Sequence, residues 1–372
     1  MREKILNVPN LRFPKYNLPL KIEKLEKVCE INPKASKLQD EFIYIDLESV
    51  VKGELIKKEK ICKKNAPSRA QRVLKYNDIC FQCVRPYQLN NYHFKILDSF
   101  QWVASTGYAQ IRTSLCNPAY LYQVINSKNF NKQVMLRCTG SSYPAINSKD
   151  LGKIEIGICD IEEQDLISIF LAKIDNRIQT QNKIIKDLEI QKKSIYDKIF
   201  KKIKCQSVPL KKLCLVNKGE QINGTELTEY GDYYFMNGGI VPSGYYSQWN
   251  TEKDTISISE GGNSCGYVQF NKEKFWAGGH CYTLIKVKCN NMYLYHYLKA
   301  NESRIMKMRI GSGLPNIQKK SIESIPILLP DNQTQQKLSY FFNLIENKIS
   351  MESELLEKYK EQKKFLLSNM FI

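Results

Sequence analysis

The chain has 372 residues, enough for two or three domains, and 42% of them are hydrophobic, which supplies ample buried cores. No apolar run reaches the roughly 18–20 residues of a membrane span, and residues 1–20 lack the apolar stretch and cleavage site of a signal peptide, so we expect a cytoplasmic protein with no membrane partner. The 56 basic and 38 acidic residues give a net charge of +18, which favours a polyanion partner but also fits a lysine-rich genome.

The first third of the chain predicts a body of short strands. Residues 41–56 alternate apolar and polar side chains before a turn, and residues 107–115 are rich in β-branched and aromatic residues. Residues 117–127, NPAYLYQVINS, predict a short helix. Cys80 and Cys83 are spaced like metal ligands, but no second such pair completes a zinc site, so we expect no metal and no cofactor.

Polar loops lie between these strands, at residues 63–72, 84–91 and 103–112. They mix Arg, Asn, Gln, Ser, Tyr and Gly, which hydrogen-bond to base edges, hold phosphates or let a backbone approach closely. For any single arginine here, an ordinary surface charge is the better interpretation, and only the arginines taken as a group favour contact with DNA. The candidate DNA contacts in this body are Ser68, Arg69, Gln71, Arg72, Arg85, Thr106 and Arg112.

A long helix is predicted next. Residues 154–160 read as a strand, Asp160 as a helix N-cap and Glu163 as its capping-box partner. About 40 residues without Pro or Gly follow, with an apolar heptad that breaks at Lys192; at about 1.5 Å per residue they span roughly 60 Å. Such a stripe favours a partner helix, although packing on its own body stays open. The expected helix-pairing residues are Ile167, Leu171, Ile174, Ile178, Ile185 and Leu188.

A second body follows the helix. Residues 255–262, 265–270 and 281–288 predict strands, and residues 290–301 predict a helix. Its glycine-bearing loops supply the candidate DNA contacts Asn237, Ser243, Tyr245, Ser259 and His280. His280 has no acidic or nucleophilic partner at a known spacing, and no phosphate-binding GxxxxGK[ST] loop or methyl-donor motif occurs. We therefore expect no catalytic residue.

The chain ends in a second copy of the first tail. Gly140–Phe200 and Gly311–Phe371 are identical at 18 of 61 ungapped positions, where chance gives about 4. The second tail repeats the strand, an N-cap at Asp331 and the heptad, with its break at Lys363. Its expected helix-pairing residues are Leu338, Phe342, Ile345, Ile349, Leu356 and Tyr359.

The repeat begins in a short junction, TGSSYPAIN at residues 139–147 and IGSGLPNIQ at residues 310–318. Ser141, Ser142 and Ser312 in these loops are symmetric candidates for contact with a DNA backbone, and a simple tight turn is an equal alternative. A weaker sequence similarity relates residues 25–32 to residues 210–217. The chain therefore consists of two tandem copies, each a variable body followed by a better-matched tail.

The layout resembles the specificity subunit of type I restriction–modification systems. VPNLRFP at residues 8–14 is similar to the usual start of that family. APSRAQR, VRPY and STGYAQIR in the first body resemble one class of its target-recognition domains, and NGGIVPSGYY, ISEGG and FWAGGHCYTL in the second resemble another. GSSYPAI and GSGLPNI resemble the repeated junction that precedes the family's conserved helices.

The resemblance implies an α+β fold with two target-recognition domains, at residues 1–160 and 205–331, each followed by a spacer helix, at residues 161–204 and 332–372. The helices would pair as an antiparallel coiled coil and set the gap between two unlike half-sites in double-stranded DNA. The implied partners are two methyltransferase subunits and, through the complex, restriction subunits; the chain itself would not be an enzyme. A specificity subunit of a fused restriction–methylation system and a coiled-coil scaffold that binds protein stay as alternatives.

Overall fold

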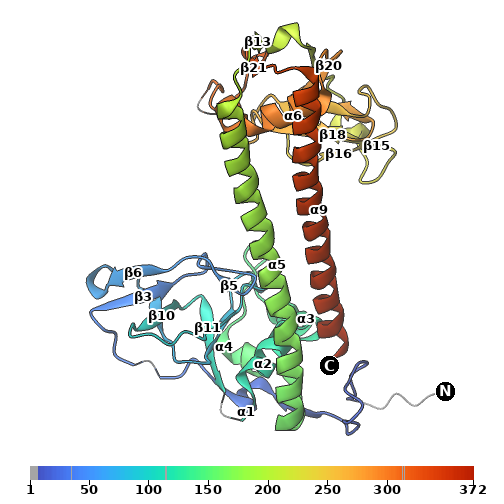
Figure 1. Cartoon of the computed structure of the whole chain (residues 1–372). Coiled ribbons are helices and arrows are strands. Elements are labelled where there is room, and N and C mark those ends of the chain that lie inside the picture. Colours follow the sequence, from blue (N-terminus) through green and yellow to red (C-terminus); the bar gives the residue numbers. More distant parts are fainter. Residues whose placement is uncertain (1–6, 35, 114, 312, 314) are drawn as a thin grey trace, which may run out of the picture. The chain divides into compact units, whose positions relative to one another are not determined.

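The structure is a computed structural model that describes residues 7–34, 36–113, 115–311, 313 and 315–372. It divides into two compact units, one formed by Met1–Asn182 with Leu355–Ile372 and the other by Lys183–Glu354. Two long helices, α5 (Ile161–Lys202) and α9 (Asn332–Asn369), contribute one part to each unit (green and red in Figure 1). Each unit therefore contains a body together with segments of both helices.

The body of the first unit contains two four-stranded sheets, with orders β6-β3-β10-β7 and β2-β11-β8-β9. Aromatic and aliphatic side chains of the second sheet pack on short helices and on the start of α5, with Phe81, Tyr120 and Leu171 in one core. The bounds are β1 Lys21–Lys24, α1 Leu25–Val28, β2 Cys29–Ile31, β3 Glu41–Ile45, β4 Val50–Val51, β5 Glu54–Leu55, β6 Glu59–Cys62, β7 Ala70–Val73, β8 Ile79–Gln82, β9 Tyr92–His93, β10 Trp102–Ser105, β11 Tyr108–Thr113, α2 Pro118–Ile125, α3 Lys128–Arg137, α4 Ser148–Gly152 and β12 Glu155–Ile158.

The body of the second unit has one four-stranded sheet, β14-β20-β17-β18, and one three-stranded sheet, β16-β15-β19. Its main core gathers Ile256, Leu284 and Leu294 around the end of α5 and the start of α9. The bounds are β13 Ser207–Pro209, β14 Leu215–Lys218, β15 Tyr233–Met236, β16 Gly244–Tyr246, β17 Thr255–Ser259, β18 Val268–Asn271, β19 Phe275–Ala277, β20 Cys281–Ile285, α6 Asn291–Ala300, α7 Glu302–Met306, α8 Lys319–Glu323 and β21 Pro326–Leu328.

The elements expected from periodicity are present, with one correction at the start of α5. Asp331 caps α9 as predicted, since its carboxylate accepts from the Thr334 amide at 3.0 Å. The capping box predicted at Asp160 and Glu163 is wrong, because both oxygens of the Glu163 carboxylate accept from Arg12 at 2.6 Å. A charged guanidinium 151 residues away outcompetes the local backbone amide for this carboxylate.

The identical glutamines of the repeat, Gln164 and Gln335, make equivalent contacts in the two units. Gln164 accepts from the Asn117 amide at 2.8 Å and donates to the Cys159 carbonyl at 2.7 Å. Gln335 does the same with the Asn290 amide and the Pro330 carbonyl, at 2.9 and 2.8 Å. Because Asn117 and Asn290 are the N-caps of α2 and α6, each glutamine fixes the short helix of its body to the long helix that follows.

Within each unit the two long helices share a core. In the first unit, Leu171 packs in one cluster with Leu366 of α9, and Lys363 Nζ lies 2.5 Å from Asp175 Oδ1. In the second unit, the Tyr196 and Phe342 rings of α5 and α9 are 4.5 Å apart, and Lys192 Nζ lies 3.1 Å from Glu346 Oε1. At the heptad breaks Lys192 and Lys363, the lysine side chains therefore form ion pairs between the helices.

The predicted helix-pairing residues are all partly or fully buried. Most members of the seam join the two main cores, and the remainder are half-buried along the helices. Buried are Ile167, Leu171, Ile174, Phe342 and Leu356, and half-buried are Ile178, Ile185, Leu188, Leu338, Ile345, Ile349 and Tyr359.

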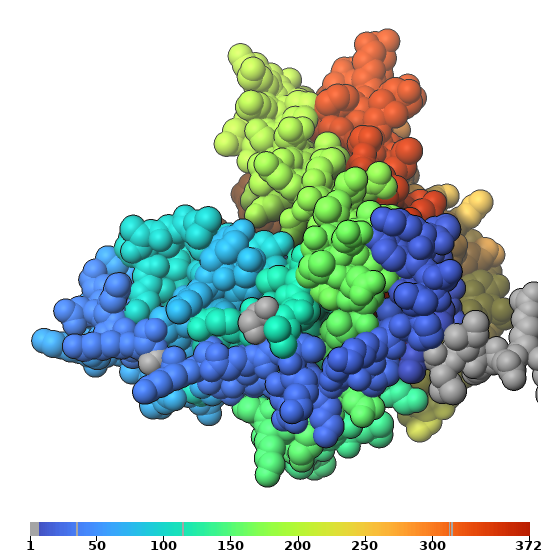
Figure 2. All heavy atoms as spheres, turned by 90° about the horizontal axis from the view of Figure 1, so that it is seen from below, coloured from blue at the N-terminus to red at the C-terminus, as the bar shows by residue number. Residues whose placement is uncertain are grey.

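The N-terminal segment lies along the start of α5 and the end of α9 within the first unit. The Leu11 amide donates to the Asn369 carbonyl at 2.9 Å, and the Phe13 ring stands edge-on to Phe170 at 5.7 Å. Figure 2 shows this blue segment against the green helix. Within the described residues, no helix combines the length and apolar character needed to cross a membrane.

Candidate nucleic-acid interface

Each junction between body and tail forms a closed loop. A β-bridge joins Thr139 to Ala145, and another joins Ile310 to Asn316 at the equivalent positions of the repeat. Gly140 and Gly311 open these loops with φ angles of 89° and 98°, a left-handed conformation that glycine adopts without steric cost. Both junctions thus have a β-bridge and a left-handed glycine at equivalent positions of the repeat.

Each junction loop forms backbone hydrogen bonds with its body. In the first unit the Pro144 carbonyl accepts from the Arg85 amide at 2.8 Å, and the Ile146 amide donates to the Cys83 carbonyl at 3.0 Å. In the second unit the Pro315 carbonyl accepts from Gly262 at 3.0 Å, and Ile317 donates to Glu260 at 2.8 Å. Segments 83–85 and 260–262 are therefore structural equivalents.

This equivalence is not visible in the sequence, because CVR and EGG share no residue. Arg85 and Gly262 nevertheless both have left-handed backbones, with φ angles of 53° and 72°. Such a conformation is uncommon for a residue other than glycine. The backbone geometry is thus retained while the side chains differ between the two bodies.

The predicted contacts of the first body, except Arg112, lie on four neighbouring segments that we call the first loop surface: Ser68–Arg72, Ser105–Gly107, Cys83–Arg85 and Gly140–Pro144. The Thr106 amide donates to the Arg69 carbonyl at 2.8 Å, and the Cys83 amide donates to the Gly107 carbonyl at 3.0 Å. The Arg85 guanidinium lies 4.4 Å from the centroid of the Tyr143 ring. Exposed on this surface are Ser68, Arg69, Gln71, Ser141, Ser142 and Tyr143.

Two of the predicted arginines, Arg112 and Arg72, are less available for contact with DNA. Arg112 donates to both oxygens of the buried Asp78 carboxylate, at 2.8 and 2.6 Å. Arg72 is half-buried, with its Nε atom out of contact with solvent and without a partner in the described part of the chain; burial lowers the pKa of its guanidinium. Sequence alone does not distinguish these two side chains from Arg69.

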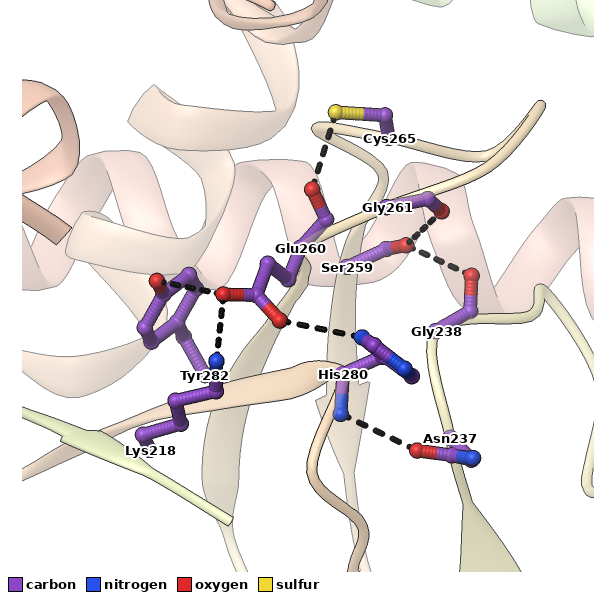
Figure 3. Close-up of polar contacts among 9 residues, drawn as sticks. All are labelled: Lys218, Asn237, Gly238, Ser259, Glu260, Gly261, Cys265, His280 and Tyr282. Carbon is purple, nitrogen blue, oxygen red and sulfur yellow. Dashed lines mark hydrogen bonds and ion pairs between the residues drawn. The ribbon is translucent and has the colours of Figure 1, made fainter. Parts of the chain in front are cut away.

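A charged network occupies the corresponding place in the second body. The Glu260 carboxylate accepts from Lys218 Nζ at 2.6 Å and from the Tyr282 hydroxyl at 2.9 Å, and its other oxygen lies 3.1 Å from His280 Nδ1 (Figure 3). Burial raises the pKa of this carboxyl group, but the hydrogen bonds from Lys218, Tyr282 and His280 outweigh burial and leave the pKa lowered. The loops Asn237–Gly238, Glu260–Gly262 and Gly278–His280 form the second loop surface.

The other candidates of the second body have mixed positions. Asn237 accepts from the His280 amide at 3.0 Å, on the second loop surface. Ser259 is buried and donates to the Gly238 carbonyl at 2.5 Å, a structural contact. Ser243 is exposed and Tyr245 half-buried around β16. Ser312 lies outside the described residues.

Sequence reasoning missed Tyr143 and Glu260 on these surfaces, and Lys218 and Tyr282, which bond to Glu260. Lys218 and Tyr282 are register partners on β14 and β20, so their approach to Glu260 depends on strand pairing between segments far apart in the chain. Tyr143 stands in the repeat where the second copy has Leu314, and this aromatic difference was the available signal. Within the described residues no group of three or more His, Cys, Asp or Glu side chains could hold a metal ion.

Two parts of the chain, residues 19–190 and 202–361, match the family described as type I restriction modification DNA specificity domain. The chain belongs to this family. Over 146 residues, 38% of the chain, it is 32% identical to a type I specificity subunit of Mycoplasma pneumoniae. Over 168 residues, 42% of the chain, it is 30% identical to one of Mycoplasma genitalium. These matches span 39% and 43% of the two relatives.

Solved structures of such subunits share the fold. The S subunit of a type I restriction-modification system from M. genitalium aligns with a TM-score of 0.66 at 17% identity, over 98% of this chain and 99% of that chain. A chain from a type I R-M complex assembly aligns with a TM-score of 0.58 at 21% identity, over 95% and 98% of the two chains. The predicted α+β class with two recognition domains and long helices is thereby confirmed.

Proposed function

We propose that this chain is the DNA-reading subunit of a type I restriction–modification complex, in which each body reads one half of a bipartite, asymmetric site. The observation that carries the proposal is the duplicated docking of the junction loops at Pro144 and Pro315 on unlike loop surfaces. Equivalent junction loops beside loop surfaces of different sequence suit the recognition of two different half-sites. The net charge of +18 suits the phosphate backbone, which dominates affinity for DNA.

We further propose that α5 and α9 pair as an antiparallel coiled coil that fixes the gap between the half-sites. Two ion pairs between the helices support one antiparallel register. Asp175 of α5 pairs with Lys363 of α9. Lys192, 17 residues further along α5, pairs with Glu346, 17 residues earlier in α9. Helices of 42 and 38 residues are about 63 and 57 Å long at 1.5 Å per residue. A rigid spacer of this kind suits half-sites held at a set separation.

The proposed partners are double-stranded DNA, two methyltransferase subunits and, through them, restriction subunits, in the cytoplasm. Large apolar side chains remain exposed on the long helices after both cores are filled, which supports docking of further subunits there. They include Ile169, Ile190, Tyr340, Met351 and Phe365. In this proposal the chain is non-catalytic, with recognition domains at 1–160 and 205–331 and spacer helices at 161–204 and 332–372.

The test is to map methylated adenines in cells that express the chain with its methyltransferase, and in cells that lack the chain. Methylation should appear at one bipartite motif only when the chain is present. The purified complex should bind that motif with an affinity that falls steeply with salt. Methylation that is unchanged without the chain, together with a flat salt response, would support the protein-binding scaffold instead.

A further inference from the structure

Every polar backbone atom of His280 is fixed, and one ring nitrogen is left free. The amide donates to Asn237 Oδ1 at 3.0 Å, and the carbonyl accepts from the Glu260 amide at 2.9 Å. The ring nitrogen Nδ1 lies 3.1 Å from Glu260 Oε2. The side chain is 63% exposed, and within the described part of the chain Nε2 has no hydrogen-bond partner. The ring therefore presents one free polar atom, Nε2, from a backbone that is fixed in place.

Two glycines, Gly238 and Gly278, fix the backbone of His280 by letting the surrounding loops approach closely. A Cβ atom on Gly238 would stand 3.0 Å from the His280 carbonyl oxygen, and one on Gly278 would stand 2.6 Å from Asn237 Oδ1. Gly238 also has a φ of 83°, in the left-handed region that favours glycine. The position of His280 is thus set by backbone packing as well as by its hydrogen bonds.

The two oxygens of Glu260 have different partners, which determines the tautomer of His280 (Figure 3). Oε1 accepts from Lys218 Nζ at 2.6 Å and from the Tyr282 hydroxyl at 2.9 Å, while Oε2 faces the histidine. An ionised carboxylate only accepts hydrogen bonds, so Nδ1 carries the proton. In the neutral imidazole, Nε2 is then an acceptor.

Resting on the proposed function, we propose that His280 Nε2 is a specificity-determining acceptor that reads an exocyclic amino group in the major groove of the second half-site. Adenine N6 and cytosine N4 are the amino groups that the major groove presents. Glu260 is the positioning residue, because it acts through the histidine. The junction loop also holds the Glu260 segment in place, since Pro315 and Ile317 form hydrogen bonds with residues 260–262.

The substitution Glu260→Gln separates this role from a merely structural one. The lysine ammonium can only donate, so the glutamine carbonyl must stay toward Lys218 and Tyr282 and the amide nitrogen must turn toward His280. That nitrogen donates, so Nδ1 becomes the acceptor and the proton moves to Nε2. The preferred base at this position should then change from adenine or cytosine to one with a major-groove carbonyl oxygen, guanine or thymine.

The experiment selects bound DNA from a library randomised in both half-sites, using the complex of the full chain with its methyltransferase. It is run at pH 8.5, two units above the ordinary pKa of about 6.5 for a free imidazole. We expect a change of preference of about tenfold or more at one position of the second half-site in E260Q. His280→Ala should lose the preference at that position without gaining another, and the first half-site should not change.

Glu252→Gln is the matched control, since it removes the same charge. Glu252 forms an ion pair of 3.6 Å with Lys274, which precedes β19, whereas His280 follows the end of that strand. Its base preference should match that of the unmodified chain. Retention of every second-half preference in E260Q or in H280A overturns the inference. Because H280A alters an exposed side chain, it provides this outcome even if E260Q does not fold. An unmodified complex that selects no bipartite sequence overturns the proposed function, and the inference with it.

Discussion

Arg112 holds the carboxylate of Asp78 with two hydrogen bonds, of 2.8 and 2.6 Å, and the Asp78 side chain is 1% exposed. The same carboxylate accepts from the Gln110 amide group at 2.7 Å and from the Lys75 backbone amide at 2.7 Å. The contacts of Arg112 and Gln110 tie β11 to the turn before β8. Arg112 is therefore part of the fold of the first body, although its sequence context resembles that of a DNA contact.

Replacing Arg112 with Met should destabilise the first unit by about 3 kcal/mol, because a buried carboxylate is left without its charged partner. Urea unfolding followed by circular dichroism measures this decrease. Arg69→Met is the matched control: its side chain is exposed, so its stability should change by less than about 0.5 kcal/mol. Equal stability of the two variants would show that the Asp78 pair contributes nothing.

Neutralising Arg69 or Arg85 should weaken DNA binding with little effect on folding. Removing one side chain that binds a phosphate should reduce the slope of log K against log salt concentration by about 0.9. Binding of Arg69→Met and Arg85→Met complexes between 50 and 200 mM salt measures this slope. A slope equal to that of the unmodified complex in both variants would exclude these arginines as phosphate ligands.

Shortening both long helices by one heptad should shorten the recognised gap. Deleting residues 177–183 together with the opposing residues 355–361 removes about 10.5 Å of helix at 1.5 Å per residue, equivalent to about 3 base pairs at 3.4 Å each. Both half-sequences should be unchanged, as mapped by methylation. A four-residue deletion in each helix is the control, because it disrupts the heptad seam and should abolish assembly; an unchanged gap in the heptad variant would reject the spacer role.

His93 should make the first unit less stable in mild acid. Burial, aided by the charge of Lys95, lowers the pKa of this histidine to about 3, and its Nε2 is buried without a partner within the described residues. Since the folded pKa lies below the unfolded value of about 6.5, the stability is complete above pH 6.5 and decreases as the pH falls toward 3. At pH 5 the decrease is about 2 kcal/mol.

His93→Phe tests this effect, because it keeps an aromatic ring beside Tyr122, 5.5 Å away, but cannot be protonated. The difference in unfolding free energy between pH 7.5 and pH 5 should decrease by about 2 kcal/mol relative to the unmodified chain. Some dependence should remain, because burial also lowers the pKa of His296. An unchanged pH difference in His93→Phe would show that His93 is not buried in its neutral form.

Periodicity was enough to predict several strands, the short helices α2 and α6 and the two long helices, because these elements depend on local spacing of apolar side chains. It was not enough for contacts that join distant segments. Glu163 has the position of a capping residue, yet Arg12 takes its carboxylate. Ser259 and Arg112 lie among loop-like polar residues, yet strand pairing places both in structural contacts.

The second loop surface shows the same limit. Glu260 is an inconspicuous acid in the sequence, and its role depends on the register of β14 with β20 and on the turn that carries His280. Only the three-dimensional fold brings those three segments together. Tyr143 was within reach of the sequence, because it is an aromatic residue of the junction loop where the second copy has Leu314.

The hydrogen bonds of Pro144 with Arg85 and of Pro315 with Gly262 join main-chain atoms. Such hydrogen bonds do not depend on which side chains stand at the bonded positions, provided the backbone there adopts a left-handed conformation. Under the proposed function, recombination that replaces one body with another of different sequence would therefore keep these hydrogen bonds. Such an exchange would change one half-site of the DNA target in a single step.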